Sequence, residues 1–124
     1  MRHGEIWLAR LNPNTGAEIG KVRPVLILLA QRYLDAGSPI VMAAPLTTQY
    51  WPGMAALRIP VSARSRLLKD SYVALEQMRA LDCSRFSDSC LGILSAEEMQ
   101  TVEHQLMMMF GIVIKGMSNN FTYS

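Results

Sequence analysis

The feature that most limits the fold is a series of short apolar segments separated by turn signals and followed by one segment with helical spacing. Short runs of branched, aromatic and leucine side chains are typical of β-strands, and clusters of Gly, Pro, Asn and Asp are typical of turns. Strands spaced about ten residues apart favour antiparallel pairing through short loops. We therefore expect a mainly β protein, a small antiparallel barrel, with one α-helix at its C-terminal end.

The expected strands follow directly from these segments. In chain order they are residues 5–11, 25–29 after an opening Pro24, 40–44 ended by Pro45, 56–61, 71–75 with 77–81 as two strands or one bent strand, and 91–94. The continuous apolar run 25–29 predicts a strand buried on both faces. Pro60 cannot donate to a ladder, so 56–61 is expected at a sheet edge.

The period changes after residue 94. Ser95 followed by Glu98 is a capping box, which predicts a helix start. The helix is expected over residues 96–114, ended by Gly116. Its apolar face is formed by Met99, Val102, Leu106, Met109 and Val113. Met107 and Met108 lie off this line, and they either face a partner subunit or widen the core stripe.

Length and composition fit one domain that needs no metal or disulfide. The chain has 124 residues, half of them apolar, and we expect a single domain over 1–115 with a loose tail over 116–124. No apolar run is long enough to span a bilayer and no signal-peptide pattern opens the chain, so a cytoplasmic location is expected. The two cysteines and two histidines match no metal motif, so no cofactor is expected.

Charge is unevenly distributed. Residues 1–85 hold eleven Lys and Arg against six Asp and Glu, a surplus of +5, and residues 86–124 hold one against four, a deficit of −3. The basic part favours an anionic partner, although a solvated surface would show the same pattern.

The segment 16–24 combines two glycines, a carboxylate and two cations between two expected strands. Arg23 is confined between Val22 and Pro24, and a restricted guanidinium suits a phosphate, although it could equally be a surface ion pair. Glu18 could accept a proton, pair with Lys21 or Arg23, or simply be solvated.

Hydroxyl and aromatic side chains follow the third expected strand. Thr47 and Thr48 can donate to a phosphate oxygen or make local turn bonds. Tyr50 and Trp51 could stack on unpaired bases, or fold back as a lid over the barrel.

A basic stretch comes next in the chain. It comprises Arg58, Arg64, Arg66 and Lys69. These side chains could follow a nucleic-acid backbone or be solvated. The sequence shows no Ser-His-Asp set, Cys-His set or phosphate-binding glycine loop. RNA cleavage by the neighbouring 2′-hydroxyl needs none of these, because orientation and charge stabilisation carry it.

The residues of three motifs resemble the MazF/PemK toxins, sequence-specific endoribonucleases of type II toxin–antitoxin systems. The first is Gly16-x-Glu18-x-Gly20-x-x-Arg23-Pro24-Val25-Leu26, after Gly4-Glu5-Ile6-Trp7 and Leu11-Asn12-Pro13; the second is Pro45-Leu46-Thr47-Thr48-Gln49; the third is Leu75-Glu76-Gln77-Met78-Arg79-Ala80-Leu81-Asp82. The resemblance runs from about Arg2 to Val113.

The resemblance implies an SH3-like antiparallel barrel with a C-terminal helix, acting as a homodimer. It implies metal-independent cleavage of single-stranded RNA to a 2′,3′-cyclic phosphate and a 5′-hydroxyl. It implies catalytic roles for Arg23, Thr47 and, as a weaker candidate, Glu18. The pKa of an arginine is too high for a resting general base, so the acceptor of the 2′-proton is left open.

RNA contacts are expected at motif residues, in the aromatic loop and in the basic stretch, and the resemblance implies protein partners. The RNA-binding candidates are Lys21, Thr48, Gln49, Tyr50, Trp51, Arg58, Arg64, Gln77 and Arg79. The partners are a cognate antitoxin with an extended acidic segment and, through the toxin–antitoxin complex, operator DNA; no membrane is involved. Ala80, where the family commonly has Thr, and the loop 50–53 depart from the family pattern and affect which bases are read.

Two other functions remain open from the sequence. A gyrase poison of the CcdB type shares this fold, and residues 106–112 have some likeness to the end of those toxins, but twelve residues follow Ile112. A non-catalytic SH3-like interaction module would explain a barrel with exposed aromatics, but not the segment 16–24 together with Thr47.

Overall fold

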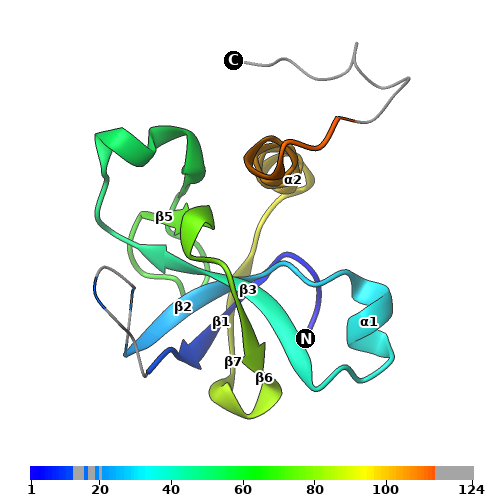
Figure 1. The fold of residues 1–124 in the computed structure, drawn as a ribbon. Coiled ribbons are helices and arrows are strands. Elements are labelled where there is room, and N and C mark those ends of the chain that lie inside the picture. The colour runs from blue at the N-terminus through cyan, green and yellow to red at the C-terminus, as the bar shows by residue number, and fades with distance from the viewer. Residues whose placement is uncertain (13–15, 17–18, 20, 114–124) are drawn as a thin grey trace.

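The order of strands shows how the apolar segments are used. A computed structural model describes residues 1–12, 16, 19 and 21–113. The strands are β1 (Glu5–Arg10), β2 (Val22–Ile27), β3 (Ile40–Thr47), β4 (Arg58–Val61), β5 (Ser71–Ala74), β6 (Arg79–Asp82) and β7 (Phe86–Ile93). The helices are α1 (Gln31–Asp35) and α2 (Ala96–Phe110), with 3₁₀ turns η1 (Pro52–Leu57), η2 (Leu75–Gln77) and η3 (Cys83–Arg85). The sheet order is β4-β5-β3-β2-β1-β7, and β6 also pairs with β3 (Figure 1).

The long strand β3 organises the sheet because it has different partners along one edge. It pairs with β2 on one side; on the other it pairs with β6 over Ile40–Ala43 and with β5 at Leu46 and Thr47. Pro45 lies between the part of β3 that pairs with β6 and the part that pairs with β5. A proline, which has no N–H to donate, is therefore tolerated at this position. The prediction that Pro45 ends this strand is therefore wrong.

The expected barrel is present as a strongly curved antiparallel sheet rather than a closed ladder. Its hydrogen-bonded path ends at β4 and β7. The connector between β4 and β5 spans this gap, because the amides of Arg66 and Leu67 both donate to the carbonyl of Leu91, at 2.9 and 3.1 Å. The expected edge position of the strand carrying Pro60 is confirmed, since β4 stands at one end of the order.

Two apolar clusters lie against the sheet, and β2 contributes to both. Leu26 belongs to the cluster that includes Met99 and Val102 of α2, whereas Val25 and Ile27 belong to a second cluster with Leu11 and others. All three β2 side chains have no exposed surface. The prediction of a strand buried on both faces is confirmed for Val25–Ile27, because alternate residues point to opposite faces.

The helix α2 begins where the sequence predicts and ends earlier. Ser95 accepts from the Glu98 amide and Glu98 accepts from the Ser95 amide, which completes the capping box. The helix stops at Phe110 because Gly111 takes a left-handed conformation with φ of 69°. The predicted end at Gly116 is wrong, and Val113 lies beyond the helix and is 65% exposed.

Several other boundaries differ from those predicted. β2 begins at Val22, so Pro24 lies inside the strand, and β7 begins at Phe86, five residues before the predicted start. β5 and β6 are separate strands joined by η2, which decides between the two predicted alternatives. The short helix α1 was not anticipated. The predicted tail over 116–124 lies outside the described residues. Among the described helices, none is long and apolar enough to cross a membrane.

Candidate active site

The register of β2 and β3 brings the two predicted catalytic side chains to one place. Val25 pairs with Pro45 and Leu26 with Ala44, so Arg23 and Thr47, each two residues beyond the pair of Val25 and Pro45, lie at the same end of this ladder. Both residues line one open pocket of about 280 Å³. Residues that are 24 positions apart in the sequence therefore meet at one site.

The pocket is suited to an anion. Its lining includes three cations, Arg23, Arg66 and Lys69, and the hydroxyl groups of Thr47, Thr48 and Ser71, and none of its described lining residues is acidic. Leu46, Leu67, Leu68 and Leu91 complete the wall. Leu68 is 85% exposed, so the rim offers an apolar contact next to the cations. Guanidinium and hydroxyl donors around an apolar wall match a phosphodiester with a base attached.

Thr47 is held for donation. Its Oγ1 accepts a hydrogen bond from the Gln49 amide at 3.2 Å, so the hydroxyl proton can be directed to another acceptor. Arg23 is exposed, which allows its guanidinium to reach a ligand. Glu18, the third predicted catalytic residue, lies outside the described residues.

The aromatic residues after β3 are exposed. Tyr50 is 49% and Trp51 is 41% accessible. The ring of Tyr50 lies 5.3 Å from that of Tyr72, and the guanidinium of Arg58 lies 5.0 Å from the ring of Trp51. The guanidinium covers part of one face of the Trp51 ring, and both rings keep exposed surface on which a base could stack.

Arg58 does not have the exposure that its predicted RNA contact requires. It is only 4% exposed, and its Nη2 lies 2.5 Å from Oε1 of Glu76. Its Nη1 donates to the carbonyl of Gln49 at 3.3 Å. With Trp51 against the same guanidinium, Arg58 connects β4, η2 and the aromatic loop. Its burial is at odds with the RNA contact that the sequence predicts, and its contacts assign it to holding the loop in place.

Arg64 is likewise engaged within the protein. It donates from Nη1 and Nη2 to both carboxylate oxygens of Glu98, at 2.5 and 2.7 Å, and from Nη1 to the carbonyl of Ile93. This bidentate pair is the main reason that the pKa of Glu98 is lowered to about 2. The Arg64 stem lies against Gly92, where a Cβ would come within 3.2 Å of its Cγ. Arg64 therefore fastens the connector to β7 and α2, and its availability for RNA is limited.

The third-motif residues support the segment that leads to Arg23. Gln77 Oε1 accepts from the Ile19 amide at 2.8 Å, and Arg79 Nη1 donates to the carbonyl of Leu11 at 2.9 Å. Lys21 and the exposed Gln49 remain candidates for RNA contact. Lys21 has a left-handed backbone with φ of 64°, and its amide donates to Asn12 Oδ1.

Other features bear on the chemistry and on what the sequence left out. Among the described side chains, no three of His, Cys, Asp and Glu are grouped to hold a metal ion. Cys83 and Cys90 are both free thiols.

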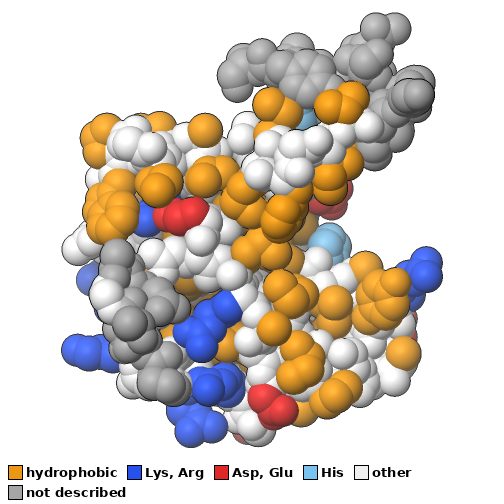
Figure 2. All heavy atoms as spheres, viewed as in Figure 1, with side chains coloured by type: hydrophobic (Ala, Val, Ile, Leu, Met, Phe, Trp, Pro, Cys, Tyr) orange, Lys and Arg blue, Asp and Glu red, His pale blue; other side chains and the backbone are white. Residues whose placement is uncertain are grey.

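Ser71 and Leu68 line the pocket but were not predicted, because nothing in the sequence marks which connector residues face the end of β3. In the view of Figure 2, most visible Lys and Arg side chains gather below and left of centre, over β1, β2 and β6.

Comparison with known proteins gives consistent matches over almost the whole chain. A family model described as "PemK-like, MazF-like toxin of type II toxin-antitoxin system" matches residues 2–110. Endoribonuclease MazF of Staphylococcus saprophyticus is 33% identical over 116 residues, covering 90% of this chain and 92% of that protein.

Solved structures share the fold. The toxin MazF-mt6 of Mycobacterium tuberculosis has a TM-score of 0.73 at 24% identity, covering 89% of this chain and 99% of that chain. An endoribonuclease in complex with its cognate antitoxin, from a mycobacterial species, has a TM-score of 0.72 at 18% identity, covering 92% and 98%. A MazE–MazF structure from Deinococcus radiodurans has a TM-score of 0.70 at 20% identity, covering 91% and 98%.

Proposed function

The chain belongs to the PemK/MazF family of type II toxin–antitoxin systems and is a toxin endoribonuclease, and from this premise we propose that Arg23 and Thr47 act together on one phosphodiester of single-stranded RNA. The observation that carries the proposal is the shared pocket, in which the exposed guanidinium and the threonine hydroxyl lie among further cations and no described carboxylate.

The proposed reaction is an internal transfer at phosphorus. The 2′-oxygen attacks the adjacent phosphorus and loses its proton, and the bond from phosphorus to the 5′-oxygen breaks. The 5′-oxygen leaves as a hydroxyl after gaining a proton, so the products are a 2′,3′-cyclic phosphate and a 5′-hydroxyl. No metal takes part in this balance.

The pocket supplies charge stabilisation at the phosphoryl oxygens. In this proposal Arg23 clamps the non-bridging oxygens and gives the leaving oxygen its proton. Thr47 donates a hydrogen bond to the same phosphoryl group. Donors fixed in this way contribute most where charge develops, with a single donor worth about a hundredfold or more in rate. The described lining residues offer no carboxylate or histidine as proton acceptor.

The surroundings of the pocket fit a flexible single strand. The exposed rings of Tyr50 and Trp51 would stack bases beside the cleaved phosphate. Thr48 and Gln49 directly precede these rings in the chain, and Lys21 directly precedes β2. Stacking of this kind is worth about 1–3 kcal/mol per base. The same cations would hold the extended acidic segment of a cognate antitoxin, and we infer a cytoplasmic homodimer whose antitoxin complex binds operator DNA.

The test is cleavage of a long single-stranded RNA in the presence of a chelator. The wild-type protein is expected to cut it to fragments with cyclic phosphate and 5′-hydroxyl ends. Arg23→Ala should reduce cutting by about a hundredfold to a thousandfold, as expected when a transition-state clamp is lost. Arg32→Ala, an exposed arginine on α1, is the matched control and should cut normally.

A second pair of variants tests the hydroxyl. Thr47→Ser keeps the donor and should retain most activity, whereas Thr47→Val keeps the shape and should lose it. Thermal unfolding of each variant separates loss of chemistry from loss of fold. Undiminished cutting by Arg23→Ala or by Thr47→Val in folded protein would remove that residue from the mechanism.

A further inference from the structure

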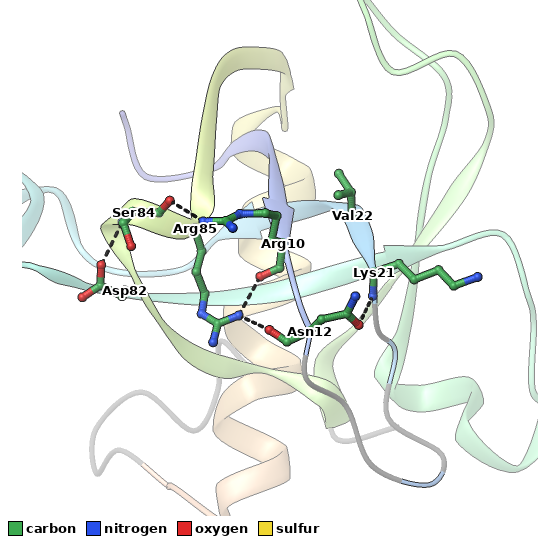
Figure 3. Close-up of a pocket in the computed structure, with 7 residues that line it drawn as sticks. All are labelled: Arg10, Asn12, Lys21, Val22, Asp82, Ser84 and Arg85. Carbon is green, nitrogen blue, oxygen red and sulfur yellow. Dashed lines mark hydrogen bonds between the residues drawn. The ribbon is translucent and has the colours of Figure 1, made fainter.

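A second basic pocket adjoins the first residue of β2. Its volume is about 520 Å³, and it is formed by the end of β1, the start of β2 and η3. Its lining residues are Arg10, Asn12, Lys21, Val22, Asp82, Ser84 and Arg85 (Figure 3). Apart from Lys21, none of them is among the predicted RNA contacts.

The two arginines of this pocket are fixed without being neutralised. Arg85 Nη1 donates to the carbonyl of Arg10 at 3.1 Å and also to that of Asn12, and Arg10 Nη2 donates to the carbonyl of Ser84 at 3.2 Å. Each guanidinium has five N–H donors, so these bonds orient the groups and leave donors for a ligand. Carbonyl oxygens carry no net charge, and the positive charge of both groups is retained.

The charge of the pocket is positive on balance. Arg10, Arg85 and Lys21 stand against the single carboxylate of Asp82. Asp82 accepts from the Ser84 amide at 2.9 Å, and this hydrogen bond is the main cause of its lowered pKa. In Figure 3 the two arginines cross between β1 and η3, and the Lys21 side chain extends away from them at the rim.

The position relative to the active site determines what this pocket would bind. Lys21 and Val22 line the second pocket, and Arg23 and Pro24, the next two residues, line the first. A single strand that leaves the first pocket across the start of β2 therefore reaches the second within a short distance. Fixed guanidinium groups are the donors best matched to phosphate oxygens.

We propose that the pocket of Arg10, Lys21 and Arg85 binds a backbone phosphate of the RNA substrate other than the one that is cleaved. This proposal rests on the proposed function and extends it from one phosphate to a second. The subsite reads no base; it fixes the path of the strand and contributes affinity that depends on salt. Strands too short to reach it would lose that contribution.

The test uses RNA that cannot be cut, with a single 2′-deoxynucleotide at the position identified by a cleavage map. Two lengths are compared: one with only the nucleotides flanking the cleaved bond, and one extended in both directions. Arg10→Gln should weaken binding of the long strand and reduce the slope of log affinity against log salt by about 0.7, the value for one phosphate contact on a single strand. It should not change the dissociation constant for the short strand.

Arg32→Gln, which removes a charge from exposed α1, controls for net charge and should leave both affinities unchanged. The proposal is overturned if Arg10→Gln affects both lengths equally or affects neither. Arg23→Ala in the cleavage assay keeps the two ideas apart. Normal cutting by that variant removes the proposed mechanism, whereas the length dependence of Arg10→Gln still decides the second subsite.

Discussion

At the residue scale, the arginines differ by the partner that each one has. Arg58 and Arg64 are paired with Glu76 and Glu98, whereas Arg23 is exposed at the first pocket and Arg10 at the second. Nothing in the sequence separates these cases, because each carboxylate partner lies 18 or 34 positions away from its arginine. Burial and pairing are properties of the folded sheet, so a run of basic residues in the sequence overstates the RNA-binding surface.

The pair of Arg64 and Glu98 predicts a pH dependence of stability. The pKa of Glu98 is about 2 in the folded protein, below its ordinary value of 4.5, so the ionised form is stabilised by folding. This contribution is complete above about pH 4.5 and is lost as the pH falls toward 2. Arg64→Met should lower the free energy of unfolding by about 1 kcal/mol at pH 7, and the difference from wild type should shrink between pH 4.5 and 2.

Urea unfolding at several pH values measures this difference. Arg66→Met is the matched control, because Arg66 is exposed in the same connector and has no carboxylate partner among the described residues. Its difference from wild type should not change with pH. A gap between Arg64→Met and wild type that stays constant down to pH 2 would contradict the role given to the ion pair.

At the scale of elements, β4, η2 and the aromatic loop form one unit through Arg58. The side chain of Arg58 is 2% exposed and that of Glu76 is 14% exposed. Removing one member of a buried pair leaves the other charge unsolvated, at a cost of about 3–5 kcal/mol. We therefore expect Arg58→Met and Glu76→Gln each to be strongly destabilising, and the double variant to cost much less than the sum.

Unfolding by urea gives the coupling energy of this pair. Binding of uncut RNA gives a second readout, since Arg58 also holds Trp51 and the Gln49 carbonyl. The double variant should bind RNA more weakly than wild type even where its stability is recovered. Additive losses of stability would mean that the two side chains do not depend on each other, and unchanged RNA binding would separate the pair from the aromatic loop.

Elements defined by local chemistry could be read from the sequence, and those defined by neighbours could not. The capping box at Ser95 and the buried strand around Leu26 depend on residues within one turn or one strand, and both were predicted. Pro45 was misread because a proline is acceptable wherever the adjacent strand leaves a gap, and that gap exists only because β6 gives way to β5. The helix end was misplaced because Gly111 and Gly116 are both glycines that could end a helix in a left-handed conformation, and the sequence does not show which one does.

At the scale of the whole molecule, the family motifs singled out two distant residues that the fold brings into one pocket. The motifs associated Arg23 with Thr47, and the antiparallel register of β2 and β3 explains why they share a pocket. The pocket wall formed by Ser71 and Leu68 could not be predicted, because it depends on how the connector spans the open edge of the sheet. The second basic pocket was missed for the same reason, since Arg10 and Arg85 lie 75 positions apart and meet only in the fold.

The positive surplus of residues 1–85 and the two basic pockets predict that binding and cutting respond differently to the sugar. Phosphates are common to RNA and DNA, so single strands of the same sequence should bind with similar slopes of log affinity against log salt, about −0.7 for each phosphate contacted. Only RNA has the 2′-hydroxyl that attacks phosphorus, so the DNA strand should remain intact at any enzyme concentration. One ribonucleotide placed at the mapped position in that DNA should restore cutting at that bond alone.

Titrations from low to high salt and product analysis of the three strands measure both effects. Cutting of the all-DNA strand, or affinity that does not change with salt, would mean that the pockets do not act on the sugar–phosphate backbone as proposed.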